Sequence, residues 1–311
     1  MAGLTISAVR FGTLGRVSLP KTDTAVTYPA GALTGTGAVL HVETLPDGRL
    51  AVLLDTTPVH PVDAGWPDQG PDRATLTTPD GREVPVLDCV VGATDGTALF
   101  LGGDIPVRKG TEGWVFAVVH VLPGDTGIAE GNRVEVRVDG EHRAALSAGH
   151  TACHLAALAL NRQLAGAWKK DVPADAAGNP NFDALAIETT TILPGGSRDV
   201  YRLGKSLRRK GFLPDALLTD PAAVEKGVNA TLAEWVASDA EVRIECESDL
   251  LTGMRRWVCD LPGGSVGIPC GGTHLASLAA VSEIEVRLSC EPGEGAAEVV
   301  MDTICTRTGS A

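Results

Sequence analysis

Two short segments of this chain carry four side chains that commonly bind metals, and their spacing restricts how the chain can fold. His150 and His154 are four residues apart, and so are Cys270 and His274. Residues four apart share one face of an α-helix, so each pair could reach a single ion from one helical turn. Because residues 155 to 269 separate the two pairs, only tertiary folding could bring them together. We therefore predict a shared metal site.

Three imidazoles and one thiol suit tetrahedral Zn²⁺, which is the predicted cofactor. The chain has only seven histidines, so chance pairing is the weaker explanation. Cys153 lies between the two helical histidines but about 100° away around a helix, and we expect it to pack in the core. Gly271 and Gly272 precede Thr273 and His274. They either form a tight turn or expose backbone N–H groups that could hold a carbonyl oxygen or a ribose hydroxyl.

The composition indicates an acidic globular protein. The formal net charge is -13, which argues against binding polyanions over the whole surface, and we expect no DNA partner. The seven cysteines are widely spaced, the N-terminus lacks a charged region followed by an apolar run, and no apolar run approaches about 18 residues. These features predict a cytoplasmic protein with reduced thiols and no membrane span.

One local basic cluster stands out on this acidic chain. Residues 198–210 hold six basic residues against one acid. Such a run is usually a solvated helix face, and contact with tRNA phosphates is the alternative. The six are Arg198, Arg202, Lys205, Arg208, Arg209 and Lys210.

The patterning predicts an α+β protein in two domains. Residues 1–110 show short apolar runs separated by Pro-Asp-Gly-Arg turns, which is typical of hairpins in a small β-barrel. Residues 57–70, rich in Pro and Gly, interrupt the strands and form either a surface loop or a binding loop. Residues 111–311 mix strands with helices. The expected elements there are a helix capped by Ser147, a loop at 169–184, a helix at 221–238, and strands at 241–247, 283–288 and 297–301.

The segments His-Thr-Ala-Cys-His (150–154) and Cys-Gly-Gly-Thr-His (270–274) resemble the paired HxxxH and CxxxH motifs of the alanyl-tRNA synthetase editing domain and its free-standing AlaX relatives. The strand and the Arg-Val-Asp-Gly-Glu-His-Arg segment ahead of the first motif also match, and so does the position of the loop from Thr57 to Gly65. The resemblance implies a zinc-binding trans-editing enzyme that hydrolyses the ester of a mischarged aminoacyl-tRNA. It also implies an N-terminal β-barrel followed by an α+β editing domain.

The loop departs from the family pattern Tyr-Pro-Glu-Gly-Gly-Gly-Gln-Pro. Here positions 60–67 read His-Pro-Val-Asp-Ala-Gly-Trp-Pro, so Asp63 and Ala64 replace glycines and Trp66 replaces the glutamine. If this loop, with His60, Asp63 and Trp66, lines the amino-acid pocket, the shape and polarity of that pocket differ from those of the family. Serine on an alanine tRNA is the family's commonest substrate, and some relatives, including the fluorothreonyl-tRNA deacylases, act on other small or hydroxylated residues. The resemblance thus implies a small, hydroxylated amino acid such as serine, threonine or a threonine analogue, including fluorothreonine.

The chemistry leaves several alternatives open. Zinc could activate water, but four protein ligands close a tetrahedral site, and closed sites are usually structural. The 3′-terminal ribose hydroxyl could assist instead, with Gly271–Thr273 holding the developing oxyanion. No Ser-His-Asp or Cys-His arrangement is supported, and His60 is only a possible acid or base. A zinc-stabilised tRNA-binding module without catalysis is the competing hypothesis.

Overall fold

The computed structural model describes residues 19–291 and 296–309, and the N-terminal segment in which no leader pattern was expected lies outside them. By its internal contacts the chain divides into two units. Of the described residues, the first unit comprises 19–143 and 246–254, and the second comprises 144–245, 255–291 and 296–309. The division falls well after the expected boundary near residue 111, because two strands that follow it pair with the first sheet. No helix in the described ranges is both long and apolar enough to cross a membrane.

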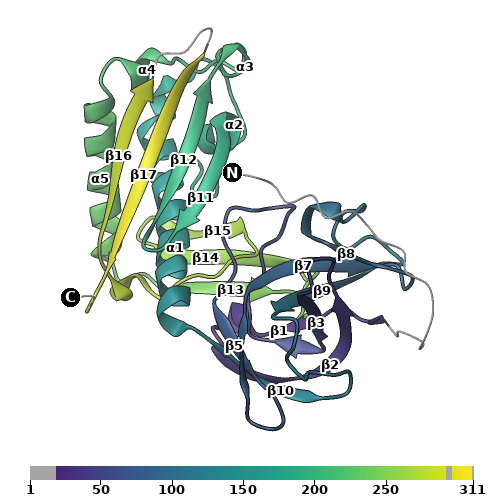
Figure 1. Cartoon of the computed structure of the whole chain (residues 1–311). Coiled ribbons are helices and arrows are strands. Elements are labelled where there is room, and N and C mark those ends of the chain that lie inside the picture. The colour runs from purple at the N-terminus through teal and green to yellow at the C-terminus, as the bar shows by residue number, and fades with distance from the viewer. Residues whose placement is uncertain (1–18, 292–295, 310–311) are drawn as a thin grey trace. The chain divides into compact units, whose positions relative to one another are not determined.

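The first unit is built on an eight-stranded antiparallel sheet that curls into a half-barrel (Figure 1). Its edge strands, β6 and β8, do not pair with each other in the described part of the chain. In sheet order the strands are β6 (Glu83–Val86), β5 (Ala74–Thr77), β10 (Arg133–Val138), β2 (Thr34–Thr44), β3 (Leu50–Leu54), β9 (Val115–Leu122), β7 (Asp88–Thr94) and β8 (Leu99–Leu101).

Much of this sheet is predicted by residues that lie close together in the sequence. The predicted Pro-Asp-Gly-Arg turns connect β2 to β3 and β5 to β6, each as an antiparallel hairpin. Strand β10 alternates exposed and buried residues, as its Arg-Val-Glu-Val-Arg-Val sequence predicts. Two short strands, β1 (Ala25–Val26) and β4 (Thr56–Thr57), pair in parallel. The unit also contains two 3₁₀ turns, η1 (Tyr28–Ala30) and η2 (Gly102–Asp104).

The second unit has two antiparallel sheets. The four-stranded sheet runs in the order β11 (Ile187–Leu193), β12 (Gly196–Leu203), β17 (Ala297–Arg307) and β16 (Val281–Glu291). The three-stranded sheet contains β13 (Val242–Cys246), β14 (Arg255–Leu261) and β15 (Gly264–Pro269). The helices are α1 (Gly140–Gln163), α2 (Phe182–Ala186), α3 (Lys205–Arg209), α4 (Asp215–Leu218) and α5 (Pro221–Val236), with 3₁₀ turns η3 (Ala165–Ala167) and η4 (Leu278–Ala280).

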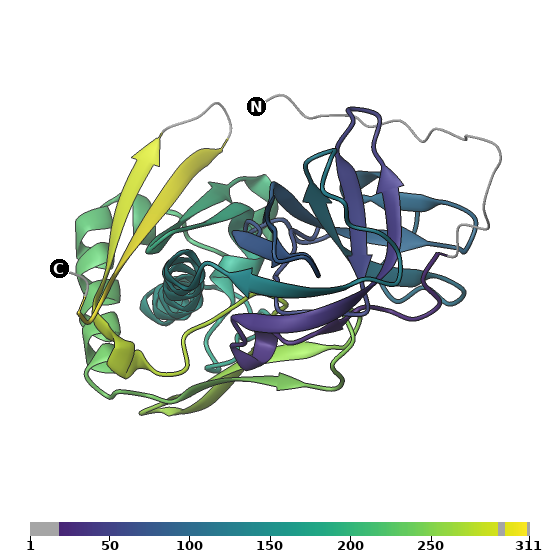
Figure 2. The same ribbon diagram turned by 60° about the horizontal axis from the view of Figure 1, so that its bottom comes forward.

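Helix α1 is the centre of the second unit. Figure 2 looks along it, with the four-stranded sheet on one side and β14 and β15 on the other. One hydrophobic cluster joins apolar residues of α1 to Tyr201 on β12 and Trp257 on β14. Helix α5 begins at Pro221 as predicted, with the Asp220 side chain capping it through the Ala223 N–H.

The predicted start of α1 at Ser147 is wrong. The helix begins seven residues earlier, at Gly140, because the Asp139 carboxylate accepts the N–H groups of Glu141 and His142 at 3.1 Å each. Ser147 is therefore a buried residue inside the helix. The loop expected over 169–184 is largely present, with α2 beginning at Phe182.

Candidate metal centre

The four predicted ligands converge in the second unit. Their candidate ligand atoms all lie within 4.8 Å of one another. His150 and His154 sit on one face of α1, as the spacing predicts. Cys270 and His274, however, lie in an irregular segment that follows β15, so the helical turn expected for this pair is wrong. The Cys270 N–H donates to the Arg255 carbonyl at 3.1 Å, which anchors the segment to β14 in a non-helical conformation.

The distances between donor atoms suit one small ion. Cys270 Sγ is 3.4 Å from His150 Nε2 and 3.2 Å from His274 Nε2. Donor atoms of a tetrahedral zinc site lie about 3.4–3.6 Å apart, given its bond lengths of about 2.0–2.3 Å. The imidazole of His154 stacks on that of His274, with centroids 5.1 Å apart and planes 22° apart.

The His154 ring provides a test of whether the residues fit a metal. Its Nε2 is buried and makes no hydrogen bond to any described residue. Burial lowers the pKa of His154 to about 4, so the imidazole is neutral at neutral pH, which is the form that binds metals. A buried polar atom without a partner is costly unless something else satisfies it. An ion held by these four residues would do so, and the donor set therefore fits zinc.

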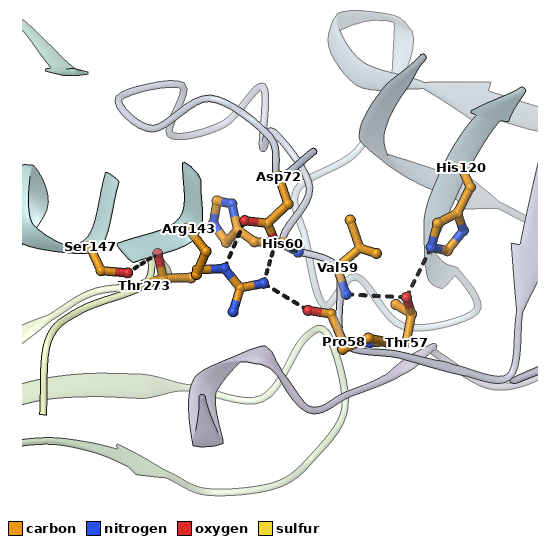
Figure 3. A network of polar contacts seen from close by, with 9 residues as sticks. All are labelled: Thr57, Pro58, Val59, His60, Asp72, His120, Arg143, Ser147 and Thr273. Atoms are coloured by element: carbon orange, nitrogen blue, oxygen red, sulfur yellow. Dashed lines mark hydrogen bonds and ion pairs between the residues drawn. The ribbon is translucent and has the colours of Figure 1, made fainter. Parts of the chain in front are cut away.

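Two hydroxyl groups on α1 orient the segment that carries Cys270 and His274. The Thr151 hydroxyl lies 3.3 Å from His274 Nδ1 and accepts the Leu275 N–H at 3.1 Å. With Nδ1 engaged, the His274 Nε2 is left to face Cys270, as outer-shell partners of metal-binding histidines commonly arrange. Ser147 donates to the Thr273 hydroxyl at 2.9 Å (Figure 3), and both side chains are buried.

Two glycines near the ligands behave differently. A Cβ on Gly149 would lie 2.3 Å from the Leu193 carbonyl oxygen and 2.4 Å from that of Gly196, so α1 passes close to the β11–β12 hairpin only because residue 149 has no side chain. A Cβ on Gly271 would meet nothing within 4 Å, and its φ is not positive. Neither a tight approach nor a left-handed turn therefore requires glycine at 271, while Gly272 is buried beside it.

The expected substrate loop lies in the first unit and is tightly held. Arg143, in the first turn of α1, forms a bidentate ion pair with Asp72 and donates to the Pro58 carbonyl at 2.8 Å (Figure 3). The Asp72 carboxylate also accepts the His60 N–H at 2.6 Å, and the His60 ring packs edge-on against Tyr28. These contacts fix both ends of the segment from 58 to 72.

The tip of that loop is open to solvent. The Trp66 side chain is 69% exposed, and its Nε1–H donates to Asp68 at 2.9 Å. Burial raises the pKa of Asp68 above its ordinary value. Asp63 forms an ion pair with Lys109. An indole held in one orientation and left exposed is available to contact a ligand.

The basic residues of 198–210 do not share one helix. Arg198 and Arg202 point from β12 and pair with Asp302 and Glu188 at 3.3 and 3.2 Å. The others belong to α3 and its C-terminal end, and within the described ranges they make no ion pair: Lys205, Arg208, Arg209 and Lys210. A groove of about 560 Å³ runs beside them, with Arg202, Lys205 and Ser206 in its lining.

Sequence reasoning missed several residues around the centre. Thr151 carried a weak signal, because it lies inside the first motif, whereas Gly149 directly precedes His150 without any pattern that marks a close contact. Trp257 packs against His154 but lies outside both motifs in sequence. Cys153 was correctly expected to pack in the core, where its thiol donates to Asp199 at 3.7 Å.

Comparison with known proteins finds similarity to alanine–tRNA ligases, although no protein-family profile matches the chain. The chain is 27% identical over 247 residues to an alanine–tRNA ligase of Frankia alni, 28% over 247 residues to that of Granulibacter bethesdensis, and 26% over 249 residues to that of Frankia casuarinae. The alignments cover 76–78% of this chain but only 22–24% of each ligase. The chain thus spans less than a quarter of the length of these relatives. This weak similarity over most of the chain is consistent with the editing-domain family that the two motifs resemble.

Proposed function

We propose that this protein is a zinc-dependent aminoacyl-tRNA deacylase, which hydrolyses the ester between a wrongly attached amino acid and its tRNA. The observation that carries the proposal is the convergence of His150, His154, Cys270 and His274, from segments 120 residues apart, to within 4.8 Å. The similarity to alanine–tRNA ligases over three quarters of the chain supports tRNA as the partner.

In this proposal the four residues hold the ion, and a bound zinc ion would act as a Lewis acid toward an ester carbonyl or water. The protein's own groups fix the geometry. Thr151 orients His274, and Ser147 holds Thr273. The backbone from Gly271 to Thr273 would then hold the ester carbonyl oxygen as negative charge develops on it. Water adds to the carbonyl carbon, the bond to the ribose oxygen breaks, and that oxygen takes a proton.

The amino acid is proposed to contact the loop that carries His60, Asp63 and Trp66. Asp63 and the neighbouring Asp68 supply acceptors for a hydroxyl or an α-ammonium group. We therefore propose a small, hydroxylated amino acid, namely serine, threonine or a threonine analogue such as fluorothreonine. A pocket that hydrogen-bonds a substrate hydroxyl discriminates strongly against analogues that lack it.

The tRNA backbone is proposed to contact α3 and its C-terminal end. Arg208 and Arg209 are exposed and, in the described part of the chain, free of ion pairs, so their charge is available for phosphates. Arg198 and Arg202 would first have to release the carboxylates of Asp302 and Glu188 before they could bind phosphates. Reversing Arg208 and Arg209 to Glu should weaken tRNA binding and flatten its salt dependence, because each lost phosphate contact removes about one unit of the slope.

The test is a deacylation panel with tRNAs that carry alanine, serine, glycine, threonine or a threonine analogue. We expect the wild-type protein to release one of the hydroxylated residues, and His150→Ala to abolish turnover with loss of bound zinc. The closed four-residue ligand set favours one alternative, a zinc-stabilised tRNA-binding module. That alternative predicts tRNA binding without release of any amino acid, and this outcome would reject the deacylase.

A further inference from the structure

We propose that Trp257 positions the ligands of the metal centre and reports ion binding through its fluorescence, an inference that rests on the zinc site of the proposed function. Trp257 lies on β14 and its side chain is fully buried. Its ring centroid is 5.0 Å from that of His154 and 5.9 Å from that of His274. One indole thus touches a candidate ligand from each of the two motifs.

The two histidines depend on this contact to different degrees. His274 is oriented by the Thr151 hydroxyl. The buried Nε2 of His154 has no hydrogen-bond partner among the described residues, so ring packing holds the His154 side chain in place. Trp257 packs against it at an interplanar angle of 47°, with the stacked ring of His274 as the other aromatic neighbour. Removing the indole would let the His154 ring leave the orientation in which it faces the other ligands.

The β14–β15 hairpin, which carries Trp257, also positions Cys270. Trp257 pairs in register with Ile268 on β15, and β15 ends at Pro269, directly before Cys270. The Arg255 carbonyl, two residues before Trp257, accepts the Cys270 N–H. The indole and the thiol are therefore fixed to one short piece of sheet, and a shift of Trp257 would be transmitted to both motifs.

Packing in the hydrophobic core alone does not explain why residue 257 is a tryptophan. The indole Nε1–H is buried and has no acceptor among the described residues. A buried donor without a partner costs free energy that a phenyl or leucine side chain would not. The large ring at this position is therefore better explained by its contacts with the two histidines than by packing alone.

The test compares W257F and W257L with W235F in the full chain. Trp235 is buried in α5 and, in the described residues, makes no ring contact with a candidate ligand, so it is the matched control. Zinc affinity is measured by competition with a chromophoric chelator. We expect W257L to raise the zinc Kd about 10- to 100-fold, W257F to raise it less, and W235F to leave it unchanged.

Tryptophan fluorescence emission provides a second measurement, which would not respond to zinc if Trp257 had a purely structural role. Zinc should change the emission of the wild-type protein and of W235F but not that of W257F. A wild-type zinc Kd in folded W257L, or a zinc-induced change that persists in W257F, would overturn the inference. If W257L does not fold, the W257F emission decides. Zinc binding without deacylation would refute the proposed activity alone, whereas zinc binding that is indifferent to Trp257 would refute this inference alone.

Discussion

Breaking the buried ion pair between Arg143 and Asp72 should destabilise the first unit by several kcal/mol. The two residues are only 5% and 4% exposed. Arg143 Nε donates to Asp72 Oδ1 at 2.7 Å, Nη2 donates to Oδ2, and Nη2 also donates to the Pro58 carbonyl at 2.8 Å. The carboxylate further accepts the His60 N–H at 2.6 Å. Both carboxylate oxygens of Asp72, and the Nε and Nη2 groups of Arg143, are therefore engaged inside the protein.

Arg143→Met leaves the Asp72 carboxylate buried with the His60 N–H as its remaining donor among the described residues. Asp72→Asn leaves a buried guanidinium without its counter-charge. Removing one partner of a buried pair costs about 3–5 kcal/mol, because an uncompensated charge remains. The double variant leaves no such charge. Its cost should fall below the sum of the single costs by about 2–3 kcal/mol, the upper part of the range for residues in contact.

Urea denaturation followed by circular dichroism measures these free energies of unfolding. The matched control is Arg137→Met, which breaks an ion pair with Glu83 whose side chains are 63% and 60% exposed. An exposed pair contributes at most about 1 kcal/mol. The reasoning is refuted if Arg143→Met costs no more than Arg137→Met, or if the Arg143 and Asp72 costs add within about 0.5 kcal/mol.

Two further predictions concern the second unit. Burial raises the pKa of the Asp199 carboxyl from 3.8 to about 6. Its protonation therefore stabilises the folded state below pH 3.8, and this stabilisation is lost as the pH rises through 6. The free energy of unfolding of Asp199→Asn should therefore rise relative to that of the wild type by up to about 3 kcal/mol between pH 4 and 7. Urea denaturation across this range checks the sign, and parallel pH profiles would contradict it. Gly149→Ala should cost about 1–3 kcal/mol and weaken zinc binding, because its Cβ meets backbone rather than a movable side chain. Gly166→Ala, which meets nothing within 4 Å, is the control in the same thermal and chelator assays.

The elements that the sequence predicts well depend on residues close together in the chain. The two Pro-Asp-Gly-Arg turns are complete hairpin signals in themselves, and Pro221 after Asp220 marks a helix start. The expected start of α1 at Ser147 is wrong, although the correct signal is also local. Asp139 caps the helix through two N–H groups, and Ser147 lies a further two turns inside.

The division of the chain required information that no local pattern contains. Strand β9 pairs with β3 and β7, and β10 pairs with β2 and β5, so the segment after residue 111 completes the first sheet. Residues 246–254 also belong to this unit, where the Leu251 N–H donates to the Thr24 carbonyl at 2.9 Å. These pairings join residues that are tens to hundreds of positions apart, and only their mutual fit selects them.

The four candidate ligands converge as predicted, but the local reason given for one pair is incorrect. Both pairs are four residues apart, but only His150 and His154 lie on a helix. Cys270 and His274 reach the same point from a non-helical segment, held by Arg255 through one backbone hydrogen bond and by Thr151 through the imidazole. The four-residue spacing thus limits how far apart two ligands can lie, and it does not specify the conformation between them. Substituting Thr151 or Trp257 should therefore perturb the second pair more than any change in helix propensity between 270 and 274.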